Sequence, residues 1–313
     1  MIKNLNSITV FAPATTANVV VGFDILGFAI EALGDEITLV KSSNESLRIE
    51  SITGSEHVPY DLNKNTVTVA LLAMLDYLNL KQGFHVHIKK RIPISSGLGG
   101  SAAGSVAALV ALNHFLESPL SREQLVEFAL TAEQTACGVR HGDNVIPCLY
   151  GGMTLIQSLS PAQVIRLPLI PLYVVLLHPH MHLSTREARA VLDLSLDLSL
   201  HVKQNARIAA FVSALYEKDY ERLEASCVDD LIEPMRAHLI PGFFEVKSVA
   251  YQFGALACSI SGSGPTMFAL VKTMLQAQHV VKRMAMEFKK IGMECDSFIT
   301  KISLEGAKIV DEN

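Results

Sequence analysis

Short stretches in the first half of the chain look like β-strands, and most of them alternate apolar and polar residues as half-buried strands do. They lie at residues 7–11, 36–40, 47–52, 84–88 and 153–159. Apolar residues recur at helical spacing over residues 65–78, and the Ala- and Leu-rich stretch 101–116 predicts a second helix. Ser121 and Gln124 form a capping-box pattern, which predicts a third helix ending at Gly138.

The second half opens with residues 172–177, a continuous apolar run that is typical of a strand buried on both faces. Further strands are predicted at residues 257–260, 266–271 and 298–302, and helices at residues 186–192, 205–216, 245–253 and 274–290. The order strand, helix, strand, strand, helix, strand predicts an α+β sandwich of the ferredoxin-like type.

A cluster of prolines separates the two halves and is the best candidate for a domain boundary. Pro161, Pro168 and Pro171 fall close together there. A single core rarely grows past about 250–300 residues, so a chain of 313 residues favours two cores. We therefore divide the chain into an N-terminal domain of residues 1–165 and a C-terminal domain of residues 166–313.

Residues 192–200 read Leu-Asp-Leu-Ser-Leu-Asp-Leu-Ser-Leu. This perfect alternation, taken alone, predicts a strand. Because the stretch lies between two predicted helices, a partly buried connector explains the pattern as well, and its role stays open.

Composition excludes several classes of protein. The 26 Lys and Arg against 31 Asp and Glu give a formal charge of −5, without the basic surface that binding to nucleic acid requires. Mean hydropathy is +0.32, yet the longest apolar runs, 102–112 and 167–177, are interrupted and shorter than the ~20 residues of a membrane span. The N-terminus does not resemble a secretory signal, and the five cysteines contain no Cys-x-x-Cys pair. We expect a cytoplasmic protein without membrane contact; whether it forms a homodimer stays open.

A glycine-rich segment precedes the second predicted helix. Residues 93–103 read Pro-Ile-Ser-Ser-Gly-Leu-Gly-Gly-Ser-Ala-Ala. Glycines let the backbone approach a ligand closely, and the N-terminus of a helix presents N–H groups and a positive dipole end. This combination is typical of a phosphate cradle, although a flexible turn before a structural helix explains it equally well. It is not a Walker P-loop, because no Gly-Lys-Ser/Thr follows.

Three sequence blocks together resemble the motifs of the GHMP small-molecule kinases, which include galactokinase, homoserine, mevalonate and phosphomevalonate kinases. The blocks lie at residues 12–27, 93–103 and 261–266, in the order expected for the family. The resemblance spans nearly the whole chain. It implies a two-domain α+β fold, with an N-terminal ribosomal-protein-S5-like domain and a C-terminal ferredoxin-like α/β sandwich.

Segments at residues 141–152, 184–190 and 230–242 are similar to the homoserine kinase branch of this family. This resemblance implies ATP-dependent phosphorylation of L-homoserine to O-phospho-L-homoserine in threonine biosynthesis, with ATP and Mg²⁺ as cofactors. The chain departs from the family at Gly100, where Ser is usual, and at Gly104, where Ser is common. We expect the loss of a hydroxyl at Gly100 to weaken nucleotide binding only modestly.

The resemblance also implies a nucleotide site. Its residues are Pro93, Ile94, Ser95, Ser96, Gly97, Leu98, Gly99, Gly100, Ser101, Ala102 and Ala103, with Asn65 and Lys90 near the base or sugar. Ser101 and Glu133 are the expected magnesium ligands, since Mg²⁺ prefers oxygen. Without the motif, Glu133 would be read as a surface residue of an amphipathic helix.

Homoserine carries a carboxylate, an ammonium group and a hydroxyl, and each needs its own partner. Arg189 and Arg236 are the candidates for the carboxylate, which matches the planar fork of a guanidinium. Asp24 is the candidate for the ammonium group. The residues expected to orient the amino acid and its hydroxyl are Asn18, His141, Asn144 and Thr185. Alternatively, Arg189 and Arg236 are solvated helix residues, and Asp24 is a loop residue that makes hydrogen bonds within its own turn.

No general base is evident in the sequence. Asn144 stands where several relatives have Asp, and Asn cannot accept a proton at neutral pH. We expect in-line transfer that depends on positioning and charge neutralisation, with Asn144, Ser101 and Glu133 as the catalytic set and Asp143 as the untested candidate base. Two alternatives stay open: a related kinase with a mevalonate-like acceptor, which lacks the ammonium group that Asp24 would bind, and a nucleotide or metabolite sensor without turnover.

Overall fold

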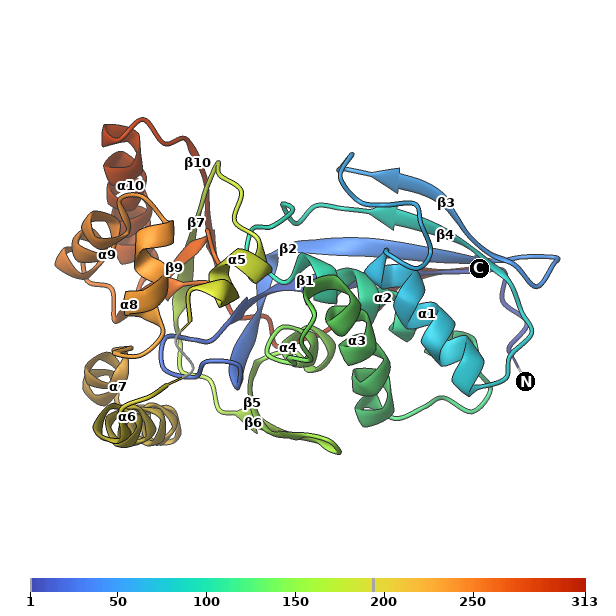
Figure 1. Ribbon diagram of the computed structural model, residues 1–313, viewed down its shortest axis with the longest axis horizontal. Helices are drawn as coiled ribbons and strands as arrows, with labels where there is room; N and C mark the ends of the chain where they lie inside the picture. Colours follow the sequence, from blue (N-terminus) through green and yellow to red (C-terminus); the bar gives the residue numbers. More distant parts are fainter. Residues whose placement is uncertain (1, 193–194) are drawn as a thin grey trace.

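The computed structural model describes residues 2–192 and 195–313 and contains two β-sheets with helices packed against them (Figure 1). The larger sheet lies on the side of the molecule where both termini are found, and the smaller sheet lies beside it. The two sheets and their helices confirm the predicted two-domain α+β fold.

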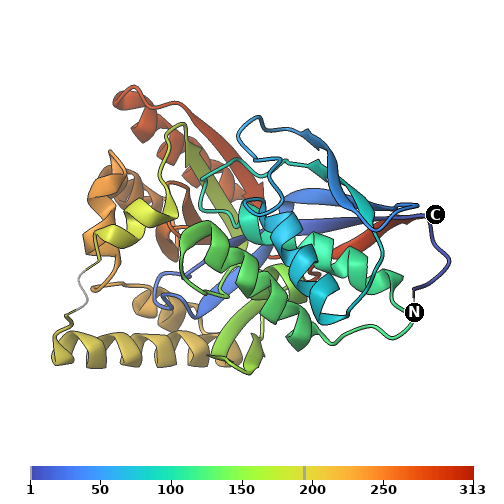
Figure 2. The ribbon, with the colours of Figure 1, turned by 45° about the vertical axis from the view of Figure 1, so that its right-hand side comes forward.

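The larger sheet has the strand order β11-β1-β2-β4-β3, with β5 paired to β2 and β6 paired to β5. Its strands are β1 (Ser7–Ala17), β2 (Leu26–Lys41), β3 (Leu47–Thr53), β4 (Phe84–Lys89), β5 (Met153–Leu159), β6 (Ala162–Leu167) and β11 (Lys308–Glu312). The helices of this part of the chain are α1 (Thr66–Tyr77), α2 (Gly100–Phe115), α3 (Arg122–Cys137) and α4 (Val145–Tyr150). Figure 2 shows α1, α2 and α3 packed beside one another, with α2 against the sheet.

Helix α2 occupies the centre of the first core. Most of its side chains are buried, which its run of Ala, Gly, Ser and Val permits because small residues allow close packing on every side. Strand β4 buries alternate residues, and Phe84 meets Phe115 of α2 with ring centroids 5.1 Å apart. The sheet thus holds the C-terminal turn of α2 in place.

The smaller sheet has the order β10-β7-β9-β8, formed by β7 (Tyr173–Pro179), β8 (Ala257–Ile260), β9 (Met267–Val271) and β10 (Cys295–Thr300). Helices α9 (Phe243–Gln252) and α10 (Met274–Lys290) cover one face, as in a ferredoxin-like sandwich. The other face packs against the first core, where Phe268 meets Phe28 with ring centroids 6.0 Å apart. Burial on both faces explains the apolar runs of β7 and β9, whereas the edge strand β10 is partly exposed and carries Asp296 and Ser297.

The remaining helices are α5 (Thr185–Ala190), α6 (Leu198–Glu217), α7 (Tyr220–Ser226), α8 (Glu233–Arg236) and the 3₁₀ turn η1 (Ala237–Leu239). Helix α6 corrects the strand suggested by the alternation at residues 192–200. The Asp197 side chain accepts hydrogen bonds from the N–H groups of Ser199 and Leu200, so these residues form a capped first helical turn. Residues 193–194 of that stretch lie outside the described residues.

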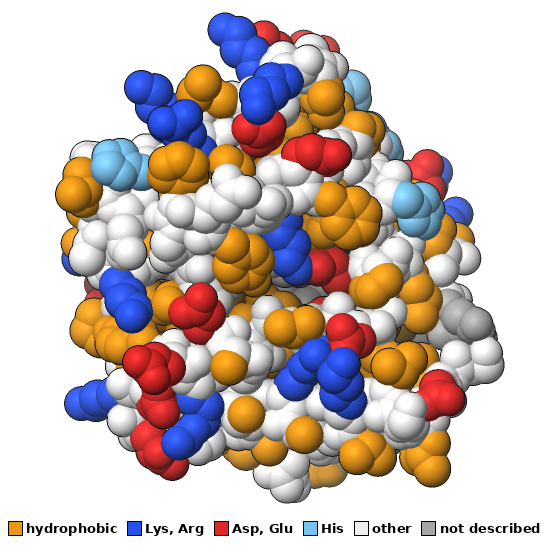
Figure 3. Space-filling model, turned by 90° about the vertical axis from the view of Figure 1, so that its left-hand side faces the viewer, with side chains coloured by type: hydrophobic (Ala, Val, Ile, Leu, Met, Phe, Trp, Pro, Cys, Tyr) orange, Lys and Arg blue, Asp and Glu red, His pale blue; other side chains and the backbone are white. Residues whose placement is uncertain are grey.

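The proposed division after residue 165 falls within β6, and β11 returns from the C-terminal end of the chain to pair with β1. On the face shown in Figure 3, Lys and Arg side chains alternate with Asp and Glu, without a basic stripe. No helix in the described part of the chain has the length and apolar character that crossing a membrane would require.

Candidate active site

Residues from distant parts of the sequence line one cavity of ≈ 350 Å³. Asn18 and Asp24 come from the segment between β1 and β2, whereas Arg236 comes from α8. All the predicted site residues line this cavity except Leu98 and Ala103, whose side chains are fully buried in the core. Those two residues can meet a ligand only through their backbone atoms. The roles assigned to the lining residues stay predictions.

The glycine-rich loop has a backbone that requires glycine. Gly97 and Gly99 have φ values of 76° and 68°, in the left-handed region. A Cβ atom on Gly97 would clash with the Ser261 carbonyl, and one on Gly99 would clash with the Thr15 hydroxyl. Gly99 also precedes α2 without a side-chain cap, so the first N–H groups of the helix are available to an anion.

The two departures from the family motif have different surroundings. A Cβ atom on Gly100 would lie 3.3 Å from Ile92 Cγ2, a contact that a small shift relieves. A Cβ atom on Gly104 would lie 3.0 Å from Val67 Cγ2, where α1 packs closely on α2. The close packing of these two helices thus accounts for glycine at position 104.

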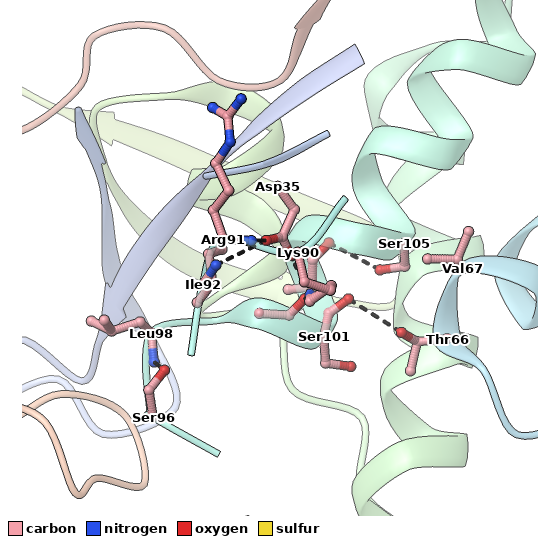
Figure 4. A network of polar contacts seen from close by, with 12 residues as sticks. Asp35, Thr66, Val67, Lys90, Arg91, Ile92, Ser96, Leu98, Ser101 and Ser105 are labelled. Carbon is pink, nitrogen blue, oxygen red and sulfur yellow. Dashed lines mark hydrogen bonds and ion pairs between the residues drawn. The ribbon is translucent and has the colours of Figure 1, made fainter. Parts of the chain in front are cut away.

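A buried ion pair lies directly beneath the loop (Figure 4). Lys90 Nζ contacts the Asp35 carboxylate and donates a hydrogen bond to the Gly100 carbonyl at 2.8 Å. The Asp35 carboxylate is fully buried and also accepts hydrogen bonds from the backbone N–H groups of Arg91 and Ile92, at 2.9 and 3.0 Å. Lys90 therefore joins the end of β4 to the start of α2, in addition to lining the cavity where a nucleotide contact was predicted.

Asn65 uses both polar atoms of its side chain within the protein. Its Oδ1 accepts a hydrogen bond from the Val67 N–H at 3.0 Å and so caps α1, while its Nδ2 donates to the Pro59 carbonyl at 2.7 Å. Asn65 therefore fixes the shape of the cavity wall that its loop forms.

Glu133 of α3 lies beside Ser101 of α2, both lining the cavity. Burial raises the pKa of Glu133, whereas His141, the Ser101 hydroxyl and Lys90 act to lower it. In the described ranges, no three His, Cys, Asp or Glu side chains form a cluster that could hold a metal ion alone. Two protein oxygens in a cavity of this kind suit Mg²⁺, which takes its other ligands from phosphates and water.

Asp24 and Arg189 form an ion pair, with 2.6 Å between Oδ1 and Nη2. Arg236 lies nearby with its Nε donating to the Ala188 carbonyl at 2.9 Å and its Nη1 donating to the Gly262 carbonyl at 3.1 Å. Burial first, and then the neighbouring Arg189, lower the pKa of Arg236 to about 10, which leaves its guanidinium charged at neutral pH. The cavity therefore holds a carboxylate and two guanidinium groups side by side.

The loop that carries Asp24 is held by Asn18. Asn18 Oδ1 accepts a hydrogen bond from the Asp24 N–H at 3.1 Å, and its Nδ2 donates to the Gly262 carbonyl at 2.9 Å. Asn18 begins a run of left-handed residues that includes Val19 and Val20, with φ values of 44° and 63°. This conformation is strained for β-branched residues, and strain of this kind is concentrated at functional sites.

Further polar residues line the same cavity. Asn144, at the start of α4, accepts a hydrogen bond from the Thr15 hydroxyl at 2.7 Å. His141 Nδ1 lies 3.4 Å from Asp143 Oδ1, and both side chains are buried. Thr185, at the start of α5, lies within hydrogen-bonding distance of Ser263, with 3.2 Å between the hydroxyl oxygens.

The third motif block closes the site from the C-terminal part of the chain. The Ser261 hydroxyl donates to the Gly97 carbonyl at 2.8 Å, and the Thr266 N–H donates to the Ser96 carbonyl at 3.1 Å. The same segment bonds Asn18 and Arg236 through Gly262. The three motif blocks therefore meet at one place.

Sequence reasoning missed several residues of this site. Thr15 lies inside the first motif block, and its hydroxyl could have been singled out there. Asp35, buried in β2, gives only the weak signal of a charged residue in an apolar strand. Ser263 lies inside the third motif block and could have been singled out there, whereas His57 lines the cavity without any signal in the sequence that we can identify.

Comparisons with known proteins agree with this geometry. The model of the GHMP kinases N terminal domain matches residues 65–152, and that of the GHMP kinases C terminal matches residues 211–290. The chain is 40% identical over 320 residues to a homoserine kinase of Chlorobium phaeobacteroides (strain BS1), covering 98% of this chain and 100% of that protein. A homoserine kinase of Chlorobaculum tepidum is also 40% identical, with 98% and 99% covered.

Solved structures give the same result. The crystal structure of homoserine kinase from Cytophaga hutchinsonii superposes with a TM-score of 0.94 at 41% identity, covering 98% of each chain. The mevalonate kinase of L. major superposes with a TM-score of 0.70 at 16% identity, over 93% of this chain and 95% of that chain, and so shares the fold alone. The chain belongs to the homoserine kinase family of the GHMP kinases.

Proposed function

We propose that this protein phosphorylates L-homoserine. It transfers the γ-phosphoryl group of ATP to the side-chain hydroxyl and yields O-phospho-L-homoserine and ADP, a step of threonine biosynthesis. Membership in the homoserine kinase family supports this activity. The single observation that carries it in the structure is the placement of Asp24, Arg189 and Arg236 in the same cavity as the glycine-rich loop.

These three charged groups match an amino acid. Asp24 and Arg189 contact each other in the structure, and a zwitterion can bridge them by giving its ammonium group to Asp24 and its carboxylate to the guanidinium. Arg236 adds a second cation for the carboxylate. A hydroxy acid without an ammonium group would leave Asp24 without this partner and would place its own carboxylate near a like charge.

The glycine-rich loop and the start of α2 provide the proposed place for the nucleotide. The first N–H groups of α2 and the backbone of the loop bind phosphate oxygens, as helix N-termini and glycine loops do. Ser101 and Glu133 would hold Mg²⁺, which when bound neutralises charge on the phosphate oxygens. Lys90 forms an ion pair with Asp35 and donates a hydrogen bond to the Gly100 carbonyl, which keeps the first turn of α2 in place.

The acceptor hydroxyl is placed by Asn144. Because Asn144 Oδ1 already accepts from Thr15, the Nδ2 group is the part of the amide that can donate to the substrate. An amide cannot take up a proton, so Asn144 is not a base, and we expect the transfer to proceed without a dedicated one. The new P–O bond forms as the bond to the ADP oxygen breaks, and the hydroxyl proton is released to water, as a loose transition state permits.

A panel of acceptors tests this proposal through release of ADP. We expect turnover with L-homoserine and far less with L-serine, L-threonine, mevalonate or galactose. Asp24→Asn should raise the KM for homoserine. The matched control is Asp230→Asn, because Asp230 forms an ion pair with Arg207 at 2.6 Å, as short as that of Asp24 with Arg189, but does not line the cavity. This control should leave the KM unchanged. Turnover with mevalonate or another acceptor, and none with homoserine, would overturn the proposal.

A further inference from the structure

An aromatic side chain lies against both arginines of the proposed carboxylate site. The guanidinium carbon of Arg189 lies 5.5 Å from the centroid of the Phe23 ring, and that of Arg236 lies 5.0 Å from it. Phe23 is half-buried and directly precedes Asp24 in the chain. The chemistry described above makes no use of this ring.

The two guanidinium groups need a partner of this kind, because they carry like charges. Arg189 is one of the causes that lower the pKa of Arg236, as expected for two neighbouring cations. Asp24 forms an ion pair with Arg189, while the hydrogen bonds of Arg236 go to the carbonyls of Ala188 and Gly262. The face of an aromatic ring carries negative potential and attracts cations within about 6 Å of its centroid.

The backbone fixes where the ring lies. Asp24 is in the left-handed region, with φ 61°, and its N–H donates to Asn18 Oδ1 at 3.1 Å. This anchor sets the direction of the chain at Phe23 and Asp24 together. One dipeptide therefore provides a ring for both guanidinium groups and a carboxylate for one of them.

We propose that Phe23 is a positioning residue that holds Arg189 and Arg236 together where they bind the carboxylate of the acceptor. The identity of that acceptor as an amino acid rests on the proposed function. An aromatic ring is required, and an apolar side chain of similar size does not replace it, because it lacks the negative potential of the ring face that attracts both cations. Loss of the ring lets the guanidinium groups separate and weakens the carboxylate site.

The test compares Phe23→Leu with Phe23→Tyr in the full chain. The first readout is calorimetric affinity for L-2-aminobutyrate, which has the charges of homoserine but no hydroxyl and so needs no phosphoryl transfer. The second is the KM for L-homoserine and for ATP. We expect Phe23→Leu to weaken the binding of L-2-aminobutyrate and to raise the KM for homoserine, each about tenfold, with the ATP KM unchanged. For Phe23→Tyr, the affinity and the homoserine KM should stay within about threefold of wild type.

Phe253→Leu is the matched control, because the Phe253 ring lies 4.7 Å from the guanidinium carbon of Arg283 and does not line the cavity. It should leave both measurements unchanged. Phe23→Met serves as a second non-aromatic variant if Phe23→Leu does not fold.

The proposal is overturned if the non-aromatic variants bind L-2-aminobutyrate as wild type does, if Phe23→Tyr is impaired as much as Phe23→Leu, or if the wild-type protein does not bind this amino acid. A wild-type protein that binds it but does not phosphorylate homoserine overturns the proposed function only. In that case the binding measurements on the variants still decide the role of Phe23.

Discussion

The hydroxyl of Thr15 donates a hydrogen bond to the side-chain carbonyl of Asn144, with 2.7 Å between Oγ1 and Oδ1. Thr15 belongs to β1, whereas Asn144 lies at the start of α4. Since one side of the amide is fixed in this way, its Nδ2 group is the part that can donate to an acceptor hydroxyl. The contact makes the orientation of Asn144 a property of the fold.

Thr15→Val tests this relationship, because valine keeps the shape of the side chain and removes only the donor. We expect kcat to fall about 3–10-fold, the effect of losing one hydrogen bond, while the ATP KM stays within about twofold. Thr9→Val is the control, since Thr9 lies on the same strand and bonds the Thr38 hydroxyl at 2.8 Å away from the cavity. An unchanged kcat in Thr15→Val would show that Asn144 needs no such orientation.

Asp143→Asn tests the claim that transfer needs no dedicated base. Asp143 is buried, lies 3.4 Å from His141 and lines the cavity, so it is the carboxylate best placed for that role. We expect kcat to fall by less than about tenfold, because positioning and charge neutralisation provide most of the catalysis. A fall of ~10³ or more in a protein with an unchanged circular dichroism spectrum would identify Asp143 as a general base.

Gly99→Ala should abolish tight nucleotide binding. The new methyl group would clash with the Thr15 hydroxyl and crowd Asn144, whose Oδ1 would lie 2.9 Å from it. We expect the ATP KM to rise more than tenfold in steady-state assays.

The control for this variant is Gly138→Ala. Gly138 is also left-handed, with φ 83°, but its Cβ atom would have no neighbour within 4 Å. This control carries backbone strain of about 1–2 kcal/mol without a clash, so its ATP KM should stay near that of wild type. An equal rise in both variants would attribute the effect to strain and not to the shape of the loop.

Glu133→Gln should trade activity for stability. Burial raises the pKa of Glu133 in the folded protein, so ionising it disfavours folding. Wild type and variant should be equally stable below the pKa of an unfolded glutamate, about 4.3. The variant should become the more stable as the pH rises toward the raised folded-state pKa, with the difference constant above it.

Thermal unfolding measured across pH checks this prediction. Above neutral pH without nucleotide, we expect the melting temperature of Glu133→Gln to exceed that of wild type by about 2–4 °C. The Mg²⁺-dependent turnover should meanwhile fall steeply, because an amide is a poor ligand for Mg²⁺. A variant that is less stable at every pH would mean that the carboxylate stabilises the fold through contacts that outweigh its burial.

The sequence predicted best the features that depend on neighbouring residues. The capping box at Ser121 and Gln124 is present at the start of α3, and α3 ends at Gly138 as expected. The glycine-rich loop before α2 could also be predicted, because its backbone is left-handed at Gly97 and Gly99 and the sequence has glycine at both positions.

Features that depend on distant residues could not be predicted in this way. The pairing of Asp35 with Lys90 and that of Asp24 with Arg189 join residues on different elements, and no local pattern indicates either pair. The alternation at residues 192–200 was misleading, since the cap formed by Asp197 starts α6 inside it. A period of two over a few residues is weak evidence when a capping residue lies within the stretch.

The identity of the acceptor is tested most directly by ³¹P NMR of the wild-type protein with ATP, Mg²⁺ and L-homoserine. The account predicts a new phosphomonoester resonance that is coupled to the γ-methylene protons of homoserine and grows in step with ADP. Inorganic phosphate as the only new product, or a phosphomonoester formed with mevalonate and not with homoserine, would contradict it.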